Sequence, residues 1–103
     1  MPNAALAQPA EFDSFISGND LYAVCKMPGF RPACMMYVAG AADAFMVAAA
    51  NGGEQTRCMP SSVTAEQLTD IVIQSLEMLP QVRHYTAASL VQAAVENVFP
   101  CPQ

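Results

Sequence analysis

The chain is poor in charged residues, and poorest in basic ones. Of its 103 residues only four are Lys or Arg, against nine Asp or Glu, which gives a net charge of −5. Nucleic-acid binding needs a basic face that displaces phosphate counterions, so this balance argues against it and favours a basic protein partner. With 53% apolar and 13% charged residues, the chain is also far from the disordered class, and its length allows one compact domain.

The sequence also lacks a long uninterrupted apolar run. The longest, Met35 to Ala50, is broken by Gly40 and Asp43 and is shorter than the roughly 18 to 20 residues that cross a bilayer. We therefore expect a buried helix there and no membrane insertion. The first eight residues lack the basic start and apolar middle of an export signal, so the protein is either cytosolic or has lost its signal.

Groups that could carry out catalysis are scarce. The single histidine, His84, lies in a polar connection, the acidic residues are scattered, and no glycine-rich phosphate loop or CxxC pair occurs. Zinc-binding cysteines usually come in close pairs with histidine partners, which this chain does not offer. We predict a binding protein that is not an enzyme and that has no metal and no cofactor.

Apolar residues recur at spacings of three and four, which predicts an all-α bundle of four helices with short connections. Residues 1–11 have no such periodicity and are predicted to form a disordered tail, which leaves 12–103 as a single helical domain. Thr64 and Gln67 form a capping-box pattern before an apolar stripe that ends at Leu79. The expected helices cover about 19–26, 32–50, 65–78 and the stretch from the cap at Thr86 to Phe99.

The second of these helices is apolar on nearly all faces, which predicts a central position in the bundle. Its Met and Ala residues exceed what three thin neighbours can cover, so we expect a homodimer, with contacts around Met36, Phe45 and Val47. Asp43 is the one charge within this helix. Either the helix exposes an edge there, or Asp43 pairs with Arg31 or Arg57.

Four cysteines in so short a chain favour two disulfides and an oxidising compartment over four buried free thiols. A helical hairpin places Cys25, at the end of the first helix, beside Cys34, at the start of the second. Cys58 precedes the third helix and Cys101 follows the fourth, so these two also meet in an antiparallel hairpin. Pairing Cys34 with Cys58 is disfavoured because a short return loop would have to span a helix of about 25 Å.

Several motifs in order resemble the Rap/Tai family of immunity proteins, over residues 17 to 101. They are Ser17-Gly18-Asn19-Asp20-Leu21, Cys25, Cys34 with Tyr37-Val38-Ala39-Gly40, Cys58-Met59-Pro60, Val63 to Leu68, Leu79-Pro80, Ala87 to Val91, and Phe99-Pro100-Cys101.

This resemblance implies a small periplasmic all-α homodimer, made with an export signal by bacteria that deploy type VI secretion. Members of the family bind and block a peptidoglycan-cleaving amidase toxin. In the amidase-4 type, a loop between the third and fourth helices plugs the catalytic cleft of the toxin. The matching segment here is Pro80 to Tyr85.

The same segment is the candidate binding site from the residues alone. Gln81, Arg83, His84 and Tyr85 lie between two well-signalled helices, and Arg and Tyr are enriched at binding hot spots, although an ordinary connector of this length is also common. We expect Arg83, His84 and Tyr85 to enter the amidase cleft without any chemistry by this protein. Glu77 is expected to assist docking to a basic rim. The alternative is a periplasmic stress chaperone or structural adaptor that binds through exposed Met and Phe.

Overall fold

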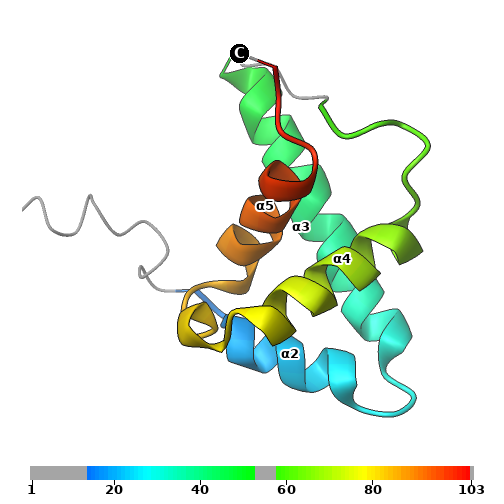
Figure 1. Ribbon diagram of the computed structural model, residues 1–103, viewed down its shortest axis with the longest axis vertical. Helices are drawn as coiled ribbons and strands as arrows, with labels where there is room; N and C mark the ends of the chain where they lie inside the picture. Colours follow the sequence, from blue (N-terminus) through cyan, green and yellow to red (C-terminus); the bar gives the residue numbers. More distant parts are fainter. Residues whose placement is uncertain (1–13, 53–57, 103) are drawn as a thin grey trace, which may run out of the picture.

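The computed structural model describes residues 14–52 and 58–102 and confirms the predicted all-α fold (Figure 1). The predicted tail over 1–11, residues 12 and 13 of the predicted domain, and Arg57 lie outside the described residues. Within the described ranges, the one β-type pairing is an isolated antiparallel bridge between Ser17 and Thr86. The elements are α2 (Gly18–Lys26), α3 (Arg31–Asn51), α4 (Ala65–Met78), the 3₁₀ helix η2 (Pro80–Val82) and α5 (Ala87–Val98).

The helix starts follow from their capping residues. Thr64 accepts a hydrogen bond from the amide of Gln67 at 3.1 Å, and the Gln67 side chain accepts from the amide of Thr64 at 2.8 Å. Thr86 caps α5 by accepting from the amide of Ser89 at 3.2 Å. These bonds satisfy amides that have no partner within the helix, so the predicted boundaries of the third and fourth helices are correct.

The core lies where all four helices meet. Leu21 of α2, Val38 of α3, Val72 of α4 and Val91 of α5 are each at most 2% exposed. Most core side chains are Val, Ala or Leu, so the helices pack closely around a thin core. In Figure 1, α2 lies across the lower end of the bundle, and α5 rises alongside the upper half of α3.

The expected central position of α3 is only partly correct. This helix contacts α2, α4 and α5, but only Cys34, Val38 and Ala42 of its 21 residues are buried. Its three neighbours have 9, 14 and 12 residues and all pack on one side, so its other side stays open. Asp43 is exposed on that side, and Arg31 instead binds Asp70. By length and composition alone α3 could cross a membrane, a property that it shares with core helices of soluble proteins.

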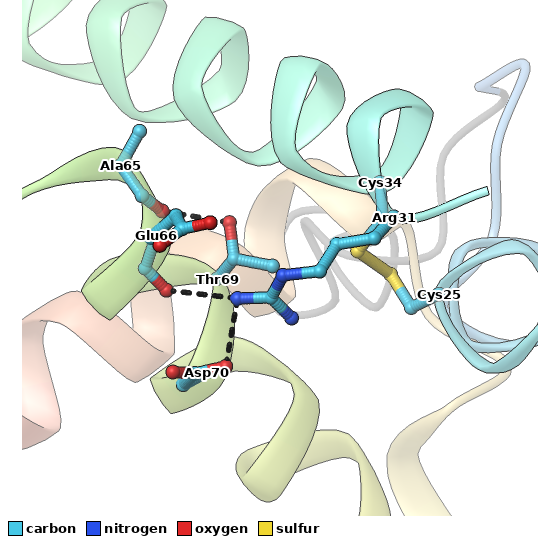
Figure 2. Close-up of a disulfide and its surroundings, with 7 residues drawn as sticks. All are labelled: Cys25, Arg31, Cys34, Ala65, Glu66, Thr69 and Asp70. Carbon is cyan, nitrogen blue, oxygen red and sulfur yellow. Dashed lines mark hydrogen bonds and ion pairs between the residues drawn. A yellow bond between two sulfur atoms is a disulfide. The ribbon is translucent and has the colours of Figure 1, made fainter. Parts of the chain in front are cut away.

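Both predicted disulfides are present: one joins the end of α2 to the start of α3, and the other joins the segment before α4 to the segment after α5. Cys25 and Cys34 have Cα atoms 4.9 Å apart, and Cys58 and Cys101 have Cα atoms 5.0 Å apart. Beside the first bridge, Arg31 donates to the Asp70 carboxylate at 2.9 Å and to the Glu66 carbonyl at 3.3 Å (Figure 2). The start of α3 is therefore tied to α2 by a covalent bond and to α4 by polar contacts.

We predict that removing the longer bridge destabilises the fold strongly. Closing the loop from Cys58 to Cys101, separated by 43 residues, is worth about 4 kcal/mol on the chain-entropy model. The Cys58→Ala/Cys101→Ala variant should therefore lose about 4 kcal/mol of unfolding free energy and roughly 15 to 30 °C of melting temperature, measured by urea and thermal denaturation. The Cys25→Ala/Cys34→Ala variant serves as the comparison for the loss of unfolding free energy, because its loop is shorter, at a sequence separation of 9. A loss below about 1 kcal/mol in the first variant contradicts this stabilising role.

Candidate functional site

The candidate site is the connection between α4 and α5. After Leu79 leaves the helix, Pro80–Val82 form the single 3₁₀ turn η2. Backbone amides close this turn: Val82 donates to Leu79 at 3.1 Å, Arg83 to Pro80 at 3.3 Å, and Tyr85 to Val82 at 3.0 Å. The candidate binding segment, Pro80 to Tyr85, is thus a hydrogen-bonded turn, hereafter the α4–α5 loop (residues 79–86).

The α4–α5 loop is held against the start of α2. The amide of Gly18 donates to the Tyr85 carbonyl at 2.8 Å, and the amide of Asn19 donates to the Arg83 carbonyl at 2.7 Å. Just before α2 begins, the Ile16 carbonyl accepts a third hydrogen bond, from the amide of Ala87 at 2.9 Å. In Figure 1 this contact is at the lower left, where the gold loop lies against the blue start of α2.

The four predicted binding residues do not share one orientation. Gln81 and His84 are exposed, whereas Arg83 and Tyr85 are half-buried. The guanidinium carbon of Arg83 lies 4.2 Å from the centre of the Tyr22 ring on α2, within range of a cation–π interaction. The buried Nε of Arg83 has no hydrogen-bond partner among the described residues. Gln81 and His84 are therefore the members of the set that are free to meet a partner.

Two exposed apolar side chains, Met78 at the end of α4 and Leu79 at the start of the loop, were missed by the sequence reasoning. Met78 is 69% and Leu79 is 42% exposed, although the apolar stripe of the third helix suggested that Leu79 faces inward. The helix ends at Met78, so Leu79 no longer follows the helical spacing that placed it on the buried side. Leu79 instead lines an open groove of about 330 Å³ with Val82, Tyr85 and Leu90. The Pro that follows Leu79 was the available sign that the helix stops there.

A larger groove lies toward the other end of the bundle. It measures about 480 Å³ and runs between the second half of α3 and the end of α5, beside the Cys58–Cys101 bridge. Its apolar lining includes Phe45, Met46 and Phe99. Among residues 14–52 and 58–102, no three His, Cys, Asp or Glu side chains form a group that could hold a metal ion. The described surfaces thus offer apolar and hydrogen-bonding contacts for a partner.

An ion pair joins α2 to α4 close to the loop. Lys26 Nζ lies 2.5 Å from Glu77 Oε2, and both side chains are well exposed. The hydrogen bond and the charge of Lys26 lower the pKa of Glu77, and those of Glu77 raise the pKa of Lys26. Glu77, which was expected to assist docking, thus already has a partner within the chain.

Comparison with known proteins gives one family. A family model described as Rap1a immunity proteins matches residues 17–101, which include all four helices, both disulfides and the α4–α5 loop. Neither the comparison with curated proteins nor that with solved structures gives a match.

We predict that the Lys26–Glu77 pair stabilises the fold only at intermediate pH. The lowered pKa of Glu77 means that its contribution is complete above the ordinary value of 4.5 and is lost as the pH falls through the folded-state value. The raised pKa of Lys26 means that its contribution is complete below 10.5 and is lost as the pH rises through the folded-state value. The stability difference between wild type and Glu77→Gln, measured as urea midpoints, should be level across neutral pH and shrink at both extremes. Equal differences at pH 3 and pH 7 would contradict this assignment.

Proposed function

This chain belongs to the Rap1a immunity protein family, and we propose that it protects its producing cell by binding a type VI secretion effector. In this proposal the effector is a peptidoglycan amidase, and the α4–α5 loop enters its catalytic cleft and blocks it sterically. The protein contributes no chemistry of its own. Both disulfides favour an oxidising compartment, which supports the periplasm as the place of action.

The observation that carries the proposal is the restrained α4–α5 loop, which exposes Gln81 and His84. Its ends continue into α4 and α5, and its carbonyl groups are bonded to the start of α2. A loop that is ordered before binding loses little conformational entropy when it docks, so more of the contact energy appears as affinity. Exposed Gln81 and His84 supply hydrogen bonds at its surface, and exposed Met78 and Leu79 supply adjacent apolar area.

We therefore assign the contacts within the predicted set unequally. Gln81 and His84 touch the amidase, together with Met78 and Leu79. Arg83 and Tyr85 instead support the loop from the protein side. The Arg83 side chain lies on the Tyr22 ring, and Tyr85 lines the groove beside Leu90. The net charge of −5 supports a basic rim around the amidase cleft.

The loop assignment predicts that the Gln81→Ala/His84→Ala variant inhibits the amidase less well. We expect a loss of about 2 kcal/mol in binding, or roughly thirtyfold in Kd, because both groups would lose contacts at the centre of the interface. The probe is a purified type VI secretion peptidoglycan amidase with which the wild-type protein forms a stoichiometric complex, titrated by calorimetry and by inhibition of peptidoglycan cleavage. The matched control is Asn51→Ala/Asn97→Ala, two exposed amides at the ends of α3 and α5.

Unchanged inhibition by a folded loop variant removes the loop from the binding surface. Weak binding to many unfolded proteins, in place of a stoichiometric complex with one hydrolase, instead supports the chaperone alternative.

We further propose that the protein is a homodimer formed through the open side of α3. Exposed residues on this helix recur at spacings of three and four, as in a helix–helix seam, and half of them are Ala or Gly, which allow close approach. Met36 and Val47 of this stripe are 71% and 59% exposed, whereas Phe45 is half-buried beside the larger groove. The stripe comprises Ala33, Met36, Gly40, Asp43, Val47 and Ala50.

The dimer proposal predicts that Gly40→Arg gives a monomer. No atom lies within 4 Å of a Cβ built at Gly40, so the folded monomer accommodates the new side chain, whereas a helix seam does not. Light scattering should give twice 10.9 kDa for wild type and 10.9 kDa for the variant. The control is Gln74→Arg, which adds the same side chain at an exposed position of α4. A monomeric wild type at micromolar concentration would rule out the dimer.

A further inference from the structure

The motif Ser17-Gly18-Asn19-Asp20-Leu21 has no role in the binding surface proposed above. Part of it is explained by helix capping, since Ser17 and Asp20 exchange side-chain to backbone hydrogen bonds of 3.1 Å each. Leu21 is a core residue at 2% exposure. Capping and core packing do not explain why a glycine occupies position 18.

Gly18 is required by the close approach of the α4–α5 loop. Its backbone does not need glycine, since the one glycine with a positive φ among the described residues is Gly29. A Cβ at position 18, however, would lie 2.7 Å from the Arg83 carbonyl oxygen and would also collide with the Leu90 side chain. Contacts this short do not occur for real Cβ atoms, so an alanine here forces the loop and α2 apart.

This close approach lets the loop satisfy the start of α2. The first amides of a helix have no partner within the helix and must find one elsewhere. In α2, the amides of Gly18 and Asn19 donate to the carbonyls of Tyr85 and Arg83, and the amide of Asp20 donates to the Ser17 hydroxyl. Separating the loop from α2 would therefore break two backbone hydrogen bonds together.

A second contact lies one helical turn further along. The Tyr22 ring supports the Arg83 guanidinium at 4.2 Å, which keeps this side chain against α2. Backbone and side chain of Arg83 are thus held by the same helix, and the neighbouring His84 remains exposed.

We propose that Gly18 and Tyr22 are positioning residues for effector binding, which hold the α4–α5 loop in its binding conformation without touching the effector. This inference rests on the proposed function of the loop. When α2 holds the loop, nearly every free molecule is competent to bind. When that hold is weakened, the apparent Kd rises in inverse proportion to the fraction of molecules in which the loop is correctly placed.

The test compares Gly18→Ala with Gly52→Ala as a matched control. A Cβ at Gly52 makes only ordinary 3.6 Å contacts, and this residue lies at the far end of α3 from the loop. We expect Gly18→Ala to raise the Kd for the same amidase at least tenfold and to speed amide exchange at Asn19 and Tyr85 in the free protein. Gly52→Ala should change neither measurement.

A second pair of variants keeps the test decisive if Gly18→Ala does not fold. Tyr22→Leu removes the aromatic face below Arg83, whereas Tyr22→Phe retains it. We expect Tyr22→Leu to bind at least fivefold more weakly than Tyr22→Phe and to exchange its Arg83 and Tyr85 amides faster, with similar melting temperatures. If Tyr22 had only a structural role, Tyr22→Leu would lower the melting temperature, but the two variants would not differ in Kd.

The outcomes separate this inference from the proposed function. If Gln81→Ala/His84→Ala weakens binding but the Gly18 and Tyr22 variants bind like wild type, the positioning role is wrong and the loop remains the binding surface. If Gln81→Ala/His84→Ala binds like wild type, the proposed contact surface is wrong, and positioning for effector binding is overturned with it. Equal loop exchange rates in Tyr22→Leu and Tyr22→Phe also overturn the hold by Tyr22.

Discussion

The hydrogen bonds between the first turn of α2 and the carbonyl groups of the α4–α5 loop determine how the shortest α-helix and the candidate binding loop are placed. A helix of nine residues is too short to be stable alone, because nucleation costs more than so few hydrogen bonds return. Its N-terminal amides depend on Arg83 and Tyr85, and its last turn depends on the bridge from Cys25 to Cys34. The loop in turn has the first turn of α2 as its support, so neither segment is placed without the other.

Different interactions close different corners of the bundle. Disulfides join α2 to α3, and the segment before α4 to the segment after α5. The α4–α5 loop, which carries the candidate binding surface, is instead held to α2 by backbone hydrogen bonds, a close contact at Gly18 and a cation–π contact. These weaker contacts hold the loop without placing a bridge within it, and its outer side chains stay accessible.

The thin core explains why so much apolar surface is left for partners. Valine and alanine dominate the buried residues, and larger side chains such as Met36, Met78 and Phe30 remain exposed. A surface of this kind is typical of proteins that complete their burial by association. Two separate areas are available for the proposed contacts: the open side of α3 for a second copy, and the α4–α5 loop for an effector.

The sequence alone determined the elements, because their signals are local. Capping at Thr64 and Thr86, the three-and-four spacing of apolar residues, and cysteines placed at helix ends predict the helices and both disulfides correctly. The orientation of the loop side chains was decided by tertiary structure, because it depends on residues more than sixty positions away in the chain. From the sequence, Arg83 is a candidate exposed hot spot, but in the structure its side chain packs on Tyr22. Gly18 is a candidate turn residue, but in the structure it is required by the close approach of the Arg83 carbonyl. Likewise, only the lengths and packing of three shorter helices decide which side of the apolar α3 remains uncovered.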